Sequence, residues 1–219
     1  MLLPLSVCAA LATCATTPTP SQAPREPGAI ALDDLRAHAH ELGLTPSDVQ
    51  DAVVSSDTTS ANTGVSHVYV SQRHRGIDVW GAVMTVNVSR DGRVINRAGT
   101  FVTGIAAKIG RTTPALTPVQ AVQSAARHLD LTFTEPIRII RAPIGAAHEA
   151  TLSAGGVAEK AIPVKLVLFP LEAGAVRLAW YVEVEERSTD HWWVVLIDAE
   201  SGALLHKSDR VVANTTGSK

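Results

Sequence analysis

The sequence has few cysteines, few aromatic residues and no excess of basic charge. Cys8 and Cys14 are its 2 cysteines, and both lie close to the N-terminus. We therefore expect the rest of the chain to have no disulfide, no thiolate metal site and no cysteine nucleophile. The formal net charge of −2 argues against nucleic acid or an anionic membrane surface as a partner.

The histidines also lack the spacing of a zinc-peptidase helix. His148 is followed directly by Glu149, as at the start of such a helix, but the residue one turn later is Leu152. Two histidines four residues apart share a helix face and can hold one metal ion, whereas leucine has no ligating atom. We interpret His148-Glu149 as a coincidence, and we expect no catalytic residue, no metal site and no cofactor.

The N-terminus has the pattern of an export signal. Residues 1–16 contain an apolar run too short to span a bilayer, followed by small residues. A lipoprotein-type signal ending at Cys14 is the alternative. The proline-rich residues 17–28 are typical of an extended linker. We expect a secreted or cell-envelope protein, lipid-anchored in the alternative, with no transmembrane segment in the mature chain.

The part of the chain at 29–110 has a helical pattern followed by strand alternation. Thr45 followed by Pro46 predicts the start of a second short helix, and from Val65 the apolar period changes to two. Asp91-Gly92 between alternating segments predicts a hairpin with a type I′ turn, in which both residues have positive φ. The residues expected in turns are Gly76, Asp91, Gly92 and Gly202.

The part at 111–209 repeats this order of elements. Thr117, Pro118 and Gln120 have the spacing of a capping box at the start of a helix. Apolar strand-like runs follow at 162–170, 175–186, 191–199 and 203–207. A helix followed by antiparallel strands, twice, predicts an α+β fold of two small modules, each a helix packed on a curved antiparallel sheet.

Two segments carry a resemblance to a known family. Residues 66–102 read SHVYVSQRHRGIDVWGAVMTVNVSRDGRVINRAGTFV, and this run resembles the propeptide module of fungalysin and thermolysin-type zinc metallopeptidases. Residues 177–205 read RLAWYVEVEERSTDHWWVVLIDAESGALL, which resembles the PepSY-like second half of fungalysin propeptides. The resemblance implies two cystatin-like modules, FTP-like at 29–110 and PepSY-like at 111–209, and then a flexible tail at 210–219.

The resemblance also implies a function. A propeptide of this kind covers the cleft of a zinc metallopeptidase catalytic domain, in cis or in trans, and helps that domain to fold. We therefore expect a non-catalytic inhibitor and folding assistant of a secreted peptidase. The alternatives are a free-standing exported PepSY-type binding module and a fragment of an extracellular metalloendopeptidase zymogen.

The expected partner-binding residues lie near the end of the second module. The chain after Lys207 is polar, so it could extend into a peptidase cleft, where the Asp209 carboxylate could approach the zinc ion. Adjacent residues of a strand point to opposite faces, so one of two neighbouring tryptophans is expected at the surface as an interface anchor. The expected contact residues are Trp192, Trp193, Asp209, Arg210 and Val211.

Overall fold

The computed structural model describes residues 25–211, in which strands contain more residues than helices do. The predicted signal, Cys14 and most of the predicted linker and tail lie outside these residues. The helices are α1 (Pro27–Ala37), α2 (Pro46–Val49), α3 (Ile105–Lys108) and α4 (Pro118–His128). The strands are β1 (Val53–Thr59), β2 (Ser66–His74), β3 (Ile77–Val88), β4 (Val94–Gly99), β5 (Ile139–Ile144), β6 (Glu149–Leu152), β7 (Ile162–Pro170), β8 (Val176–Glu185), β9 (Trp192–Asp198) and β10 (Leu204–Asp209). The predicted α+β class is confirmed.

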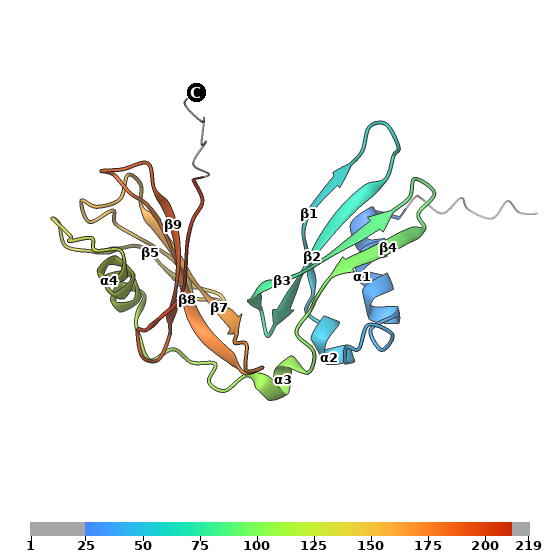
Figure 1. Ribbon diagram of the computed structural model, residues 1–219, viewed down its shortest axis with the longest axis horizontal. Coiled ribbons are helices and arrows are strands. Elements are labelled where there is room, and N and C mark those ends of the chain that lie inside the picture. Colours follow the sequence, from blue (N-terminus) through green and yellow to red (C-terminus); the bar gives the residue numbers. More distant parts are fainter. Residues whose placement is uncertain (1–24, 212–219) are drawn as a thin grey trace, which may run out of the picture.

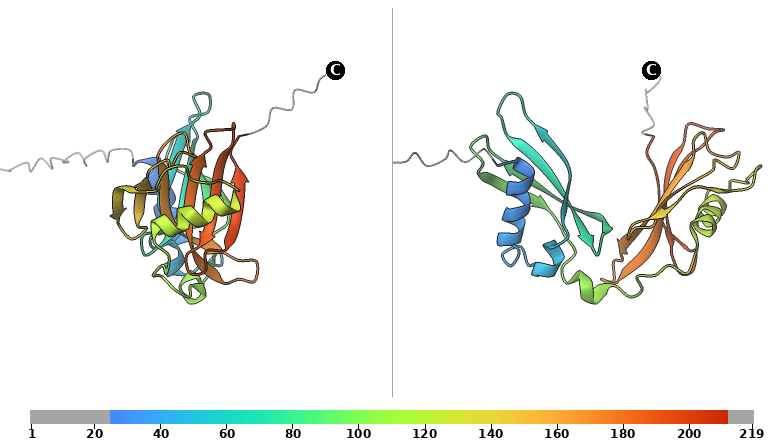
Figure 2. Two further views of the ribbon diagram at one scale, coloured as in Figure 1. Left: turned by 90° about the vertical axis from the view of Figure 1, so that its left-hand side faces the viewer. Right: turned by 180° about the vertical axis from the view of Figure 1, so that it is seen from behind.

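The strands form two groups that meet along a single short seam. Neighbours follow the order β1-β2-β3-β7-β8-β9-β10, with β4 beside β3, and β6 and then β5 beside β7. All strand pairs are antiparallel except β3 with β7, which pair in parallel at Val79 and Leu168. From this base near α3 the two groups diverge like the arms of a V, with α1 and α4 on the outer sides (Figure 1; Figure 2, right).

The first group packs one face against α1. Ala31 and Leu35 of α1 are buried, and they pack on the alternate residues of β2 and β3 that point the same way. These strand residues are Val68, Val70, Met84, Val86 and Val88. The helix begins at Pro27, so the last two residues of the predicted linker are helical.

The second group packs one face against α4. Thr117 caps this helix as predicted, since its Oγ1 accepts from the Gln120 backbone N–H and its own N–H donates to Gln120 Oε1. Val122 and Ala125 of α4 are buried in the same cluster as Trp180 of β8. The indole N–H of Trp180 donates to the Leu116 carbonyl at 3.0 Å, which satisfies its one polar group in the core.

The tight hairpin turn lies at a different place from the predicted one. Arg75 and Gly76 both have positive φ, 51° and 78°, in the two-residue connection between β2 and β3, as a type I′ turn requires. At Asp91-Gly92 only Gly92 has positive φ, because the loop is longer and the Gly92 N–H donates to the Ser89 carbonyl. The prediction of a type I′ turn at Asp91-Gly92 is therefore wrong.

A buried carboxylate ties the segment that joins the two groups to the first of them. Asp48 in α2 has no exposed surface and accepts from the backbone N–H groups of Gly104 and Ile105 at 2.8 and 2.9 Å. Gln72 of β2, also fully buried, exchanges two hydrogen bonds with the backbone of Val102. These contacts fix the chain between β4 and α3, where the strand groups diverge.

His148-Glu149 does not form a helix. Residues 145–148 make the turn between β5 and β6, His148 has a φ of 48°, and Glu149 begins β6. Within residues 25–211, no group of three or more His, Cys, Asp or Glu side chains is arranged to hold a metal ion. In the same part of the chain, every helix is too short or too polar to cross a membrane.

Candidate partner-binding cleft

A cleft of about 630 Å³ lies between the two strand groups. Its walls are formed by β2 and β3 on one side and by β5 to β8 on the other, with the β3–β7 pair at its base. Figure 1 shows that the two sheets face each other and that both long helices lie on the outer sides of their sheets. A cavity of this size, with a few convergent polar groups, is a typical binding site.

Strand alternation brings the cleft residues together. In β3, Met84 and Val86 point toward α1, so Val83 points the opposite way and lines the cleft. In β8, Trp180 lies in the α4-side core and Tyr181 lines the cleft. The cleft is therefore made mainly from the sheet faces that carry no helix, with Val79, Ala150 and Val164 of the α4-side core also in its lining.

Two aromatic side chains, Trp80 and Tyr181, line the cleft. The Trp80 ring lies 5.8 Å from the ring of Tyr181 and 5.8 Å from the ring of His206. Trp80 packs against a buried apolar cluster on this face of the second sheet, which includes Val167 and Leu196. Trp80 from the first group thus covers part of the second sheet.

Four charged groups of the cleft lining, Asp78, Lys165, Glu183 and Arg210, take part in ion pairs. Asp78 of β3 lies 3.0 Å from Arg73 Nε and 2.7 Å from Lys165 Nζ. Arg210 donates to the Tyr181 hydroxyl at 3.0 Å and has a guanidinium nitrogen 3.6 Å from Glu183 Oε1. Burial and the hydrogen bond from the Tyr181 hydroxyl to Glu183 raise the pKa of Tyr181.

Hydrogen bonds hold the end of β10 at the rim of the cleft. The Asp209 carboxylate accepts from the backbone N–H groups of Val211 and Trp192, both at 3.0 Å, and from His191 Nδ1 at 2.5 Å. The hydrogen bonds from Val211 and His191 lower the pKa of Asp209. The Arg210 N–H donates to the Trp192 carbonyl at 2.8 Å, so backbone pairing with β9 continues for one residue after β10 ends.

These contacts correct the prediction about the tail. The strand β10 includes Ser208 and Asp209, so the chain does not become a free tail after Lys207. The Asp209 carboxylate is engaged within its own sheet, which argues against the predicted approach to a zinc ion. The residues expected to contact a partner nevertheless lie together: Trp192, Trp193, Asp209, Arg210 and Val211 are at the same end of β9 and β10.

Trp192 and Trp193 point to opposite faces of β9. Trp192 is 39% exposed, its indole N–H donates to Glu183 Oε1 at 2.7 Å, and the Arg210 guanidinium lies 5.6 Å from its ring. Trp193 is half-buried, packs against the α4-side core and donates to Glu186 Oε2 at 3.2 Å. Trp192 is therefore the more accessible of the two. Its role in binding stays a prediction.

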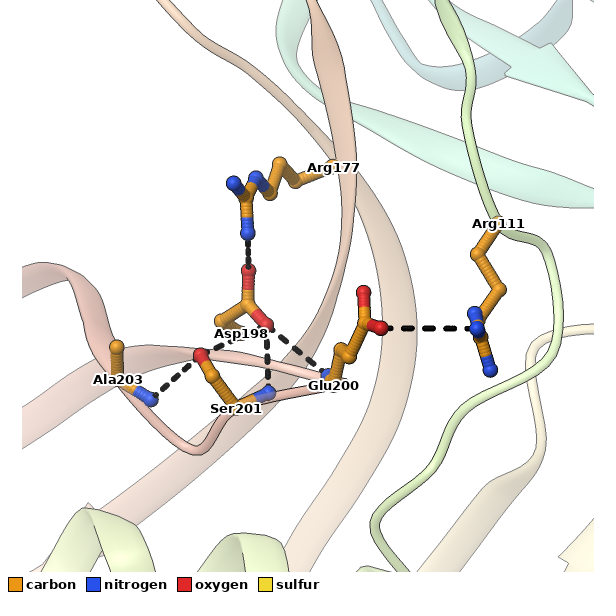
Figure 3. A network of polar contacts seen from close by, with 6 residues as sticks. All are labelled: Arg111, Arg177, Asp198, Glu200, Ser201 and Ala203. Carbon is orange, nitrogen blue, oxygen red and sulfur yellow. Dashed lines mark hydrogen bonds and ion pairs between the residues drawn. The ribbon is translucent and has the colours of Figure 1, made fainter.

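A second polar cluster holds the turn between β9 and β10 (Figure 3). Asp198 is 2% exposed and accepts from the backbone N–H groups of Glu200 and Ser201 and from Arg177. Burial alone would raise the pKa of Asp198, but these hydrogen bonds lower it. Arg111 lies 3.6 Å from Glu200 and adds an exposed ion pair. Every oxygen of Asp198 has a local partner, so its role is to shape the turn.

Comparison with known proteins identifies part of the chain. Residues 50–101 match the Fungalysin/Thermolysin Propeptide Motif. The chain is 31% identical over 165 residues to "Extracellular metalloproteinase 10" of Uncinocarpus reesii, which covers 71% of this chain and 24% of that protein. It is 31% identical over 163 residues to "Extracellular metalloproteinase MEP" of Leptosphaeria maculans, which covers 73% of this chain and 25% of that protein.

The chain therefore spans about a quarter of the length of these relatives. Among solved structures, the Bacillus megaterium YpeB C-terminal domain is similar over 84% of this chain, with 13% identity and a TM-score of 0.38. The resemblance inferred from the sequence is confirmed: the chain carries a fungalysin/thermolysin propeptide motif at residues 50–101 and is related to fungal extracellular metalloproteinases.

Proposed function

We propose that this protein is a propeptide-like inhibitor and folding assistant of a secreted fungalysin-type zinc metallopeptidase, and is not itself a catalyst. The match of residues 50–101 to a propeptide motif carries this proposal. The similarity to proteins named extracellular metalloproteinases extends it over more than two thirds of the chain. We assign an FTP-like module to 29–110 and a PepSY-like module to 111–209, each of the cystatin-like kind, and we propose export from the cell.

The fastened end of β10 supports a specific mode of inhibition. An inhibitory segment occupies a peptidase cleft as a substrate would, and it is effective only if it is presented in one direction. Asp209 and Arg210 hold the backbone near Trp192 and Val211, so the residues that follow Val211 start from a fixed point. Ordering that point before binding lowers the entropy lost on association.

The two sheets support the folding role. Each sheet is held by its own core and by antiparallel pairing, so it keeps its shape without the peptidase. A preformed surface of this kind is complementary to the native form of the peptidase, so it binds that form more tightly than the unfolded form. Such binding stabilises the native form by mass action.

The experiment uses the catalytic domain of the Uncinocarpus reesii relative, refolded and assayed with and without the full chain of this protein. Two truncated chains separate the parts of the mechanism. Ending the chain after Val211 removes only residues 212–219, whereas ending it after Lys207 also removes Asp209 and Arg210 and shortens β10.

We expect the full chain to inhibit the peptidase and raise its refolding yield. The chain that ends at Val211 should lose inhibition by about tenfold or more while still assisting refolding, because the sheets remain intact. The chain that ends at Lys207 should be weaker in both assays. No inhibition by the full chain at large molar excess would refute the proposal and would favour an exported binding module with another partner.

A further inference from the structure

We propose that the cleft between the two strand groups binds an apolar, uncharged segment of the peptidase catalytic domain. This inference rests on the proposed function and names the surface of this chain that meets the partner. The end of β10 lies at the rim of this cleft through Arg210, and most of the lining comes from side chains of β2, β3 and β5 to β8.

The distribution of aromatic side chains supports a protein partner at this surface. The whole chain has only 2 tyrosines and 4 tryptophans. Tyr181 and Trp80 line the cleft, and Tyr69 is on the same face of β2 as the cleft residue Ser71. Trp192 lines a neighbouring hollow of about 170 Å³ that shares Glu183 with the cleft. Tryptophan, tyrosine and arginine dominate the binding energy of protein interfaces.

Exposed apolar side chains stand on both walls. Val83 of β3 is 37% exposed on one wall, and Ile144 at the end of β5 is 59% exposed on the other. Tyr69, on the cleft-side face of β2, is 40% exposed. A soluble protein leaves apolar side chains grouped in this way mainly where another molecule covers them.

The charges of the cleft determine the chemistry of the occupant. Asp78 is shared by two cations, and Glu183 is paired with Arg210, so these carboxylates are already compensated. Arg141 and Glu149 add one charge of each sign on neighbouring strands. With three acidic and three basic side chains, the lining has no net charge to offset the hydration that a charged occupant would lose, whereas an apolar segment gains from contact with both walls.

The central strands of both sheets present faces, not edges, to the cleft, whereas β5 is an edge strand of one wall. The central strands β2, β3, β7 and β8 are each paired on both sides, so their backbone groups are used within the sheets. An occupant that contacts these central strands is therefore recognised through its side chains and does not pair with them as an added strand.

The test compares charge substitutions inside and outside the cleft in the full chain. Val83→Glu and Ile144→Glu place a carboxylate on either wall, and Ile95→Glu is the matched control. Ile95 of β4 is 54% exposed and does not line the cleft. All three sites are exposed, and circular dichroism and thermal melting verify that each variant is folded. The inhibition constant is measured against the Uncinocarpus reesii catalytic domain.

We expect each cleft substitution to raise the inhibition constant by about tenfold or more, because it buries an unpaired charge in the complex, and Ile95→Glu to change it less than about twofold. Between low and high salt the wild-type constant should change little, since the occupant is uncharged. Wild-type inhibition with unchanged constants for Val83→Glu and Ile144→Glu would overturn this inference and leave the proposed function intact. Absence of wild-type inhibition would refute both.

Discussion

Replacement of Asp48 by asparagine should destabilise the first strand group and the connection to the second. The Asp48 carboxylate accepts four hydrogen bonds at 2.8–2.9 Å, from the N–H and hydroxyl of Thr45 and from the N–H groups of Gly104 and Ile105. Asparagine has one oxygen in place of two. In either orientation of its amide, at least one buried backbone N–H then faces an NH₂ group.

The expected loss follows from that unpaired donor. A buried polar group without a partner costs about 1–3 kcal/mol, so Asp48→Asn should lower the free energy of unfolding by about 2 kcal/mol. Urea melts followed by circular dichroism measure this difference. Asp57→Asn is the matched control, since Asp57 is an exposed residue of β1 and should change stability by less than about 0.5 kcal/mol.

The pH dependence gives an independent test. Burial alone would raise the pKa of Asp48, but the hydrogen bonds from Thr45, Gly104 and Ile105 together lower it. A carboxyl whose pKa is lower in the folded state stabilises the fold above its unfolded pKa of about 3.9, and that stabilisation is lost as the pH falls through the folded value. The difference between wild type and Asp48→Asn should therefore shrink below about pH 4. Equal stability of the two proteins at pH 7 would show that the hydrogen bonds of the Asp48 carboxylate do not stabilise the fold.

Three further predictions concern single positions. Gly155→Val should destabilise the protein by about 1 kcal/mol or more in urea melts, at least as much as Gly92→Val. Both glycines have positive φ, and a Cβ added at Gly155 would lie 2.5 Å from a side-chain carbon of Ile137. A smaller effect at Gly155 than at Gly92 would contradict this packing. Asp198→Asn should lower the melting temperature by several degrees, since it disturbs the β9–β10 turn, and an unchanged melting temperature would show that the cluster is dispensable. The purified protein should neither cleave casein nor retain zinc; stoichiometric zinc lost on His148→Ala, measured by metal analysis, would contradict this.

Much of the fold follows from local sequence patterns. The capping box at Thr117, the four apolar runs of the second half and the alternation in β3 each depend on residues close together in the chain, and all appear in the structure. The strands β5 and β6 were not predicted. β5 is exposed along its whole length, so it lacks the apolar alternation by which strands are recognised.

The turns show the limit of dipeptide signals. Asp-Gly is the stronger signal for a type I′ turn, yet that geometry occurs at Arg75-Gly76. The Arg75 N–H donates to the Asp51 carboxylate at 2.6 Å, a contact between residues far apart in sequence. Tertiary contacts of this kind are not visible in a four-residue window.

The cleft could be anticipated only in part. Alternation places Tyr69 and Val83 on the face opposite α1, which indicates an uncovered sheet face. This face lies opposite Tyr181 only because β3 pairs with β7, and that pair joins residues about 90 positions apart in the sequence. The local pattern also does not reveal that the Glu183 side chain is only 18% exposed and lies beside Tyr181.

Both proposals for this chain require that it inhibits a fungalysin-type catalytic domain. The most direct measurement is a titration of a fixed amount of that domain with the full chain, with peptidase activity read at each ratio. We predict that activity falls in proportion to added protein and ends near one molecule of inhibitor per peptidase. Undiminished activity at large molar excess, with several related catalytic domains, would contradict the account.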